Sequence, residues 1–202
     1  MKKYFFLLLL ISAECLAQTP LLKQHFNPLQ FHKKSALKIN LTSPVFFTLS
    51  FSYEHQLGSK TSFQQGISLT QFSNNPGRNR ITSISGFQLT SDFRIYLTHE
   101  AKLKGYYQQP FIRYSDFTQQ YYLNNKHTNT FKKVVQKVHG LTIGYAIGKQ
   151  VTYSNKWLFD YFIGICYSFN IYYQNNQNLP LEYNPWTNGI GLRPGLKVGF
   201  LF

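Results

Sequence analysis

The sequence GIGLRPGLKVGFLF, residues 189–202, decides the fold. Alternate positions carry apolar side chains: Ile190, Leu192, Pro194, Leu196, Val198, Phe200 and Phe202. Most positions between them are small or charged: Gly191, Arg193, Gly195, Lys197 and Gly199. This two-residue period predicts a β-strand with one apolar face and one small or polar face. A soluble sandwich strand has the same period, so the decision depends on how often the pattern recurs.

The pattern recurs in seven earlier stretches, at residues 36–42, 45–56, 61–72, 84–97, 107–117, 138–150 and 157–171. Membrane-spanning β-barrels need lipid-facing and lumen-facing residues to alternate in segments of about ten. The connections at 119–133 and 174–188 are long and polar, as expected of extracellular loops, whereas 153–155 reads as a tight turn. The sequence predicts an all-β, eight-stranded, antiparallel up-and-down transmembrane β-barrel.

The start of the chain predicts export. Residues 1–17 have a basic beginning, an apolar core and a small-x-small cleavage site at Ala17, typical of a signal peptide. A lipoprotein signal ending at Cys15 is the alternative. Residues 18–34 show no period and are expected to be a periplasmic lead-in, with the barrel at 35–202. Beyond residue 17 no apolar run approaches the ~20 residues of a spanning helix, so a spanning protein must be a closed barrel.

Composition limits the partners and the chemistry. In a cytosolic protein, the formal net charge of +14 would suggest that the partner is nucleic acid. For an exported protein, the expected anionic partners are the lipids and lipopolysaccharide of an outer membrane. The alternative is that Lys and Arg flank the hydrocarbon region and extend their charges to water. After cleavage Cys166 is the one remaining cysteine, so no intramolecular disulfide, zinc knuckle or CxxC site can form. No metal or cofactor is predicted.

Short motifs carry a family resemblance. Residues 90–97 read TSDFRIYL, followed by GYY at 105–107 and PFIRY at 110–114. Together with LKINL at 37–41, they resemble a family of small exported barrels of Bacteroidota that carries a domain-of-unknown-function label. Asp92 stands where Glu is more usual in that family. The resemblance implies an outer-membrane barrel and no reaction; in architecture the chain is also similar to the eight-stranded OmpA and OmpX barrels.

The predicted inward face carries both signs of charge. Eight strands enclose a space that side chains fill, where unpaired charge is costly. We therefore expect an internal ion-pair network, centred on Asp92, Arg94, Arg113 and Glu54, from these residues: Lys38, Glu54, Asp92, Arg94, Arg113, Asp160 and Lys197. A structural plug is favoured over a transport path or a narrow pore for small solutes.

Inward glycines predict a thin wall on the last three strands: Gly140, Gly144, Gly148, Gly164, Gly191, Gly195 and Gly199. Long side chains from 84–97 and 107–117 are expected to fill the space beside it. The alternative is a small ligand cavity there. Cys166 shares this face and is expected to be a packing residue.

An enzyme is the alternative class of function. Lipid A acyltransferases and deacylases are barrels of this size, and they need a nucleophile with a nearby base. Residues 127–129 (HTN), or His139 opposite Ser115 or Asp116, are the nearest candidates. Because no HExxH, GxSxG or phosphate-cradling loop is present, no catalytic residue is predicted.

A surface-binding role remains, through basic and aromatic side chains expected at the extracellular rim: Arg78, Arg80, Tyr121, Tyr122, Lys126, Lys132, Lys133, Tyr183 and Trp186. Such groups stack on sugars and pair with phosphates, and loops on a rigid scaffold commonly carry function. Interfacial aromatic girdles give the same composition without binding. We expect a non-enzymatic outer-membrane barrel whose terminal Phe202 is recognised by the barrel-assembly machinery.

Overall fold

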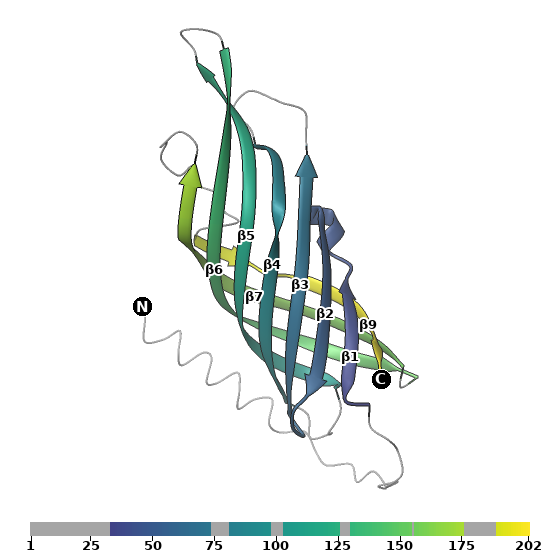
Figure 1. Cartoon of the computed structure of the whole chain (residues 1–202). Coiled ribbons are helices and arrows are strands. Elements are labelled where there is room, and N and C mark those ends of the chain that lie inside the picture. Colours follow the sequence, from purple (N-terminus) through teal and green to yellow (C-terminus); the bar gives the residue numbers. More distant parts are fainter. Residues whose placement is uncertain (1–32, 74–80, 98–102, 126–129, 155, 176–188) are drawn as a thin grey trace, which may run out of the picture. The chain divides into compact units, whose positions relative to one another are not determined.

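The described part of the chain forms nine antiparallel β-strands that close into a barrel (Figure 1). The computed structural model describes residues 33–73, 81–97, 103–125, 130–154, 156–175 and 189–202. The predicted signal peptide and all but the last two residues of the predicted lead-in lie outside these ranges. The strands are β1 Ser35–Asn40, β2 Thr48–Gln56, β3 Thr61–Ser73, β4 Ile81–Tyr96, β5 Gly105–Asn125, β6 Thr130–Tyr153, β7 Trp157–Asn175, β8 Gly189–Leu192 and β9 Gly195–Leu201.

Pairing between sequence neighbours runs unbroken from β1 to β7, and β9 pairs with both β7 and β1. β8 and β9 follow each other along the edge of β7 and together make the eighth strand of the wall. Since backbone groups in such a ladder satisfy one another, the closed ring suits a hydrocarbon environment. The predicted eight-stranded antiparallel barrel is confirmed. None of the described segments is a helix with the length and apolarity of a membrane span.

The side chains are distributed inside out relative to a soluble protein. Large apolar residues are exposed on the outer face of every long strand, as with Ile67, Ile143 and Ile163. Buried positions between them are largely polar or charged, including Gln64 and Asp92. In soluble proteins Gln and Asp are mostly exposed and Ile is mostly buried. The alternation predicted from the sequence is therefore confirmed, with the apolar face outward.

The two ends of the barrel differ. At one end, here called the turn end, short turns join β2 to β3 at residues 57–60 and β6 to β7 at Ser154, whose φ is 51°. The first and last strands also close there, since the Ser35 N–H donates to the Phe202 carbonyl at 3.1 Å and the Phe202 N–H to the Ser35 carbonyl at 2.9 Å. At the opposite end, the loop end, β5 and β6 extend beyond the other strands (Figure 1).

The long connection predicted at 119–133 is wrong. β5 continues to Asn125 and β6 begins at Thr130, with continuous pairing that ends at Asn125 opposite Thr130. Polar residues here suggested a loop, but a two-stranded ribbon that projects past the wall needs no apolar face. Its backbone ladder and branched residues such as Val134 and Val138 are enough to continue the strands.

Between β2 and β8 the strand pairing of the wall stops short of the loop end. β1 was predicted to run to residue 42 and the next strand to begin at 45, but β1 ends at Asn40 and a 3₁₀ turn, η1, occupies Ser43–Phe46. Pro44, the second residue of η1, suits the start of such a turn, and Phe47 follows the turn with a left-handed φ of 53°. β2 therefore pairs with β1 only from Phe51 onward.

The last strand, predicted to be continuous, is interrupted at Arg193 and Pro194. Arg193 still bonds to Gly164 of β7 through both backbone groups. Pro194 has no N–H with which to continue the pairing. In the described structure β8 is paired with β7 alone. We call the resulting gap in strand pairing the notch; η1, Phe47 and residues 48–50 border one side, and β8, Arg193 and Pro194 the other.

The glycines of β6 and β9 make room for rings. A Cβ on Gly144 would lie 2.4 Å from Phe111, one on Gly148 would lie 2.5 Å from Tyr107, and one on Gly195 would lie 2.2 Å from Phe162. Aromatic side chains therefore fill the space beside the thin wall. β5 supplies two of them, as predicted, but the third comes from β7.

Candidate functional site

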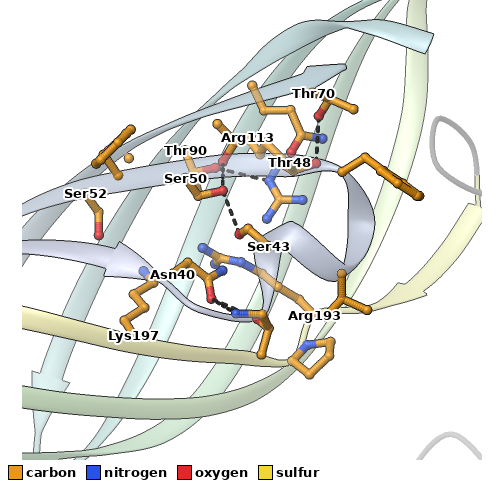
Figure 2. A pocket seen from close by; sticks show the side chains of 18 of the residues that line it. Asn40, Ser43, Thr48, Ser50, Ser52, Thr70, Thr90, Arg113, Arg193 and Lys197 are labelled. Carbon is orange, nitrogen blue, oxygen red and sulfur yellow. Dashed lines mark hydrogen bonds between the residues drawn. The ribbon is translucent and has the colours of Figure 1, made fainter. Parts of the chain in front are cut away.

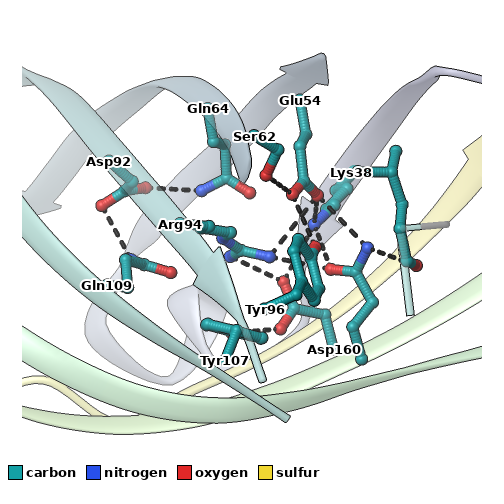
Figure 3. A network of polar contacts seen from close by, with 12 residues as sticks. Lys38, Glu54, Ser62, Gln64, Asp92, Arg94, Tyr96, Tyr107, Gln109 and Asp160 are labelled. Atoms are coloured by element: carbon teal, nitrogen blue, oxygen red, sulfur yellow. Dashed lines mark hydrogen bonds and ion pairs between the residues drawn. The ribbon is translucent and has the colours of Figure 1, made fainter. Parts of the chain in front are cut away.

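Four charged side chains form the centre of the lumen near the turn end (Figure 3). Lys38 of β1, Glu54 of β2, Arg94 of β4 and Asp160 of β7 are each 0% exposed. Lys38 Nζ pairs with Glu54 and lies 3.0 Å from Asp160 Oδ2, while Arg94 Nη2 lies 2.9 Å from the same oxygen. The two cations and two carboxylates compensate one another. We call these four residues, with the neutral groups that bond to them, the plug.

Neutral side chains complete the plug. Gln150 Oε1 accepts from both Lys38 and Arg94 at 2.7 Å, and its Nε2 donates to the Leu103 carbonyl at 2.9 Å. The Tyr96 hydroxyl donates to Glu54 at 2.7 Å, and Tyr107 donates to Asp160. These bonds join β1, β2, β4, β5, β6 and β7 across the lumen, as buried charge requires.

Asp92 lies beyond the plug, toward the loop end, and binds an arginine that the predicted network did not include. Arg193 Nη1 lies 2.8 Å from Asp92 Oδ1, and Nη2 lies 3.5 Å from Oδ2. Gln64 and Gln109 also donate to this carboxylate. The guanidinium of Arg193 stacks over Phe111, 4.1 Å from the ring centre. The alternation of the last strand predicted an inward Arg193, so the sequence did indicate that this residue could join the network.

The predicted centre of the network is corrected in two respects. Asp92 and Arg94 belong to different clusters, and Arg113 pairs with neither in the described structure. Arg113 Nε donates to Thr90 Oγ1 at 3.1 Å. Lys197 lies over Phe162, 5.1 Å from the ring centre, and among the described residues it forms no ion pair. A two-residue period assigns side chains to a face, but it does not specify their height within the lumen.

A cavity of about 460 Å³ occupies the lumen on the loop-end side of Asp92 (Figure 2). Its walls carry hydroxyl groups, among them Ser43, Ser50, Ser68 and Thr70. Ser43 Oγ donates to Ser50 Oγ and Ser50 Oγ to Ser68 Oγ, both at 2.8 Å. The predicted filled lumen therefore describes the turn-end half, and the loop-end half contains space.

Cationic side chains enter this cavity from two walls. Arg113 comes from β5, Arg193 from the break between β8 and β9, and Lys197 from β9. Figure 2 shows the Arg113 and Arg193 guanidinium groups pointing into the cavity. The lining contains one carboxylate, Asp92, which pairs with Arg193. The described cavity thus has an excess of two positive charges.

Of the candidate catalytic groups, Asp116 lies beside His139 and Ser115 does not. His139 and Asp116 pair across β5 and β6 at 3.6 Å, and Tyr114 bonds to His139 at 2.9 Å. Ser115 is 3% exposed and donates to the Gly140 carbonyl on the lumen side. A nucleophile and a base must lie within hydrogen-bond reach of each other, so Ser115 and His139 do not make such a pair here. Residues 127–129 lie outside the described ranges, and within those ranges no His, Cys, Asp and Glu side chains gather as a metal site would require.

Of the predicted rim residues, Lys133 is exposed on β6, opposite Tyr122 of β5. Tyr121, Tyr122 and Lys132 have their backbones on β5 and β6, but their side chains are outside the description. The remaining rim residues lie outside the described ranges: Arg78, Arg80, Lys126, Tyr183 and Trp186.

Comparisons with known proteins give a family but no activity. A family model described as "Protein of unknown function (DUF3575)" matches residues 4–188. Among solved structures, the N-terminal β-barrel domain of Pseudomonas aeruginosa OprF is similar, with 12% identity, a TM-score of 0.36, and coverage of 86% of this chain and 100% of that one. A search of curated proteins returned no match.

Proposed function

The chain belongs to the DUF3575 family, and we propose that it is a non-enzymatic outer-membrane β-barrel, plugged at the turn end, with a structural or surface-binding role at the loop end. The observation that carries this proposal is the outward coat of Leu, Ile, Phe and Tyr around a polar lumen. In water such a coat would expose a large continuous apolar surface, whereas lipid matches it.

Fractionation tests the location. We expect the protein to sediment with outer membranes, to resist extraction by urea or carbonate, and to show heat-modifiable mobility in gels. Recovery in the soluble periplasmic fraction would contradict the proposal.

We also propose that the barrel-assembly machinery recognises Phe202, which is 56% exposed. Phe202→Ser should lower the outer-membrane yield more than Tyr153→Ser, which alters another exposed aromatic residue at the turn end.

The plug argues against a pore. Because side chains from six strands meet across the turn-end lumen, ions should find no continuous water path through it. We expect proteoliposomes and planar bilayers that contain the protein to show no stable single-channel steps. Protease protection of the same proteoliposomes verifies insertion. Reproducible steps would favour a narrow pore for small solutes instead.

The separation of Ser115 from His139 supports the non-enzymatic assignment. Mass spectrometry of lipid A from cells with and without the protein should show identical acylation. A difference that disappears in His139→Ala or His127→Ala would identify a lipid A-modifying enzyme.

We propose that lipopolysaccharide is the ligand in the surface-binding role. Lys133 is exposed on the projecting ribbon of β5 and β6, next to Lys132 in sequence. Reversal of both lysines to Glu should weaken lipopolysaccharide binding in a salt-dependent way. The matched control reverses Lys60 and Lys156, which are exposed at the turn end. Equal effects of the two double reversals would remove a specific role for the ribbon.

A further inference from the structure

The notch lies at the height of the apolar coat. Ile190 and Leu192 of β8 pair with Tyr167 and Ile165 of β7, which belong to an exposed apolar stripe along residues 157–171. Across the notch, Leu49 of β2 pairs with Leu69 of β3, and both are exposed. In the barrel proposed above, the notch therefore faces lipid chains.

The cavity reaches the notch from inside. Its lining includes Val45 and Phe47 from one border and Leu192 and Pro194 from the other. Val45 is 74% exposed, Phe47 58% and Leu192 74%, so the same residues also belong to the outer surface. The outer coat and the cavity wall are thus continuous through the notch. Irregular backbone at membrane depth is tolerated where it lines a cavity of this kind.

Deeper in, the cavity has positive charge without a matching carboxylate. Lys197 is 5% exposed, and Asp160, which lies opposite it in the pairing of β7 with β9, is already paired with Lys38 and Arg94. Arg113 has one bonded side-chain partner in that region, the neutral hydroxyl of Thr90. Buried cations are costly unless an anion accompanies them. Ser50 and Thr90 add hydroxyl groups close to these cations.

From the apolar notch and the cationic interior, we propose that the cavity binds a single-chain amphiphile with an anionic headgroup, which enters sideways through the notch. Arg113 holds the carboxylate or phosphate, Lys197 adds positive charge to the same cavity, and the chain passes Val45, Phe47 and Leu192 toward the bilayer. The volume of about 460 Å³ suits one small ligand rather than a two-chain lipid. The proposal rests on the membrane location given above.

Binding is measured by native mass spectrometry of the full mature protein released from nonionic detergent micelles. Palmitate and palmitoyl lysophosphatidate are the two anionic probes, and their relative affinity tells whether a carboxylate or a phosphate is preferred. Monopalmitoylglycerol lacks the charge, and butyrate lacks the chain. We expect one bound anionic probe per protein, and at least about tenfold weaker binding of the neutral and the short probes. Absence of palmitate and lysophosphatidate adducts, or equal binding of butyrate or monopalmitoylglycerol, would overturn the proposal.

Two variants separate the headgroup contacts from the entrance. Arg113→Gln with Lys197→Gln should weaken the anionic probes about tenfold or more; Arg113→Gln alone is the second variant if the double variant does not fold. Leu192→Gln should weaken palmitate but not butyrate, whereas Ile147→Gln, the same change elsewhere on the outer coat, should have no effect. Unchanged binding in the Arg113 variants, or equal effects of Leu192→Gln and Ile147→Gln, would refute the site.

Failure of this inference is distinct from failure of the proposed function. If the protein fractionates with outer membranes but binds neither anionic probe, the barrel assignment stands and the cavity has another role. If it binds the probes but fractionates as a soluble protein, the cavity stands and sideways entry from a bilayer is refuted.

Discussion

The plug and the cavity occupy the same lumen, but charged side chains are balanced by opposite charges in the plug and are not balanced in the cavity. In the plug, Lys38 and Arg94 face Glu54 and Asp160 with no charge in excess, and all four are 0% exposed. In the cavity, Arg113 and Lys197 lie near hydroxyl groups and rings, with Asp92 already bound to Arg193. Full burial therefore requires an ion-pair partner, whereas space beside a charge allows water or a ligand to replace that partner.

The largest expected effect comes from breaking the plug. Asp160→Asn removes the carboxylate shared by Lys38 and Arg94, and we expect it to lower the free energy of unfolding by about 3–5 kcal/mol because two buried cations lose a counter-charge. Asp116→Asn is the matched control on the outer face and should cost less than about 1 kcal/mol. Urea titration in lipid vesicles measures both. Similar losses would mean that the plug does not stabilise the barrel.

Two arginines at the border between plug and cavity should respond differently. Arg193→Gln leaves buried Asp92 without its ion pair, and we expect a loss of about 2–3 kcal/mol. Arg113→Gln removes a charge that has no ion-pair partner in the described structure, so we expect the free energy of unfolding to change by less than about 1 kcal/mol. The same urea titration measures this. Equal losses would show that the cavity needs its charges as much as the plug does.

Packing gives the smallest difference. A Cβ on Gly144 would meet Phe111 and the Ile165 carbonyl at 2.4 and 2.6 Å, so Gly144→Ala should cost about 1–3 kcal/mol. On the same strand and face, Gly140 lies nearer the cavity, and its Cβ would meet the Ser115 hydroxyl at 2.9 Å. Because that side chain can turn away, Gly140→Ala should cost less. Thermal unfolding in detergent compares the two variants, and the reverse order would contradict tighter packing around Phe111 than around Ser115.

The fold could be predicted because successive side chains in a strand point to opposite faces, so the position of a residue along the strand determines its face. Lys38, Glu54, Arg94 and Asp160 were all assigned inward, and the structure brings them together. Apolar residues at the intervening positions, such as Ile39 and Tyr161, were assigned outward and are exposed. A repeating local rule therefore sufficed for the wall.

The contacts inside the lumen could not be predicted in the same way. Contacts between inward residues depend on the register of strands that are far apart in sequence, and a shift of one residue changes that register. The pair of Arg193 and Asp92 is an example. The notch was also missed, since it depends on η1 and Pro194 acting together from distant parts of the sequence. A break at Pro44 was predicted, whereas Pro194 was assigned to the apolar face of a continuous last strand.

The pairing of β1 with β9 has a consequence for biogenesis. Residues 35–40 of β1 pair with residues 197–202, and Ala36 meets Leu201 across almost the whole barrel sequence. Contacts between such distant positions form late and slowly, since the intervening chain must first be ordered. We therefore expect the pairing of β1 with β9 to form last, after the ladder from β1 to β7 is complete.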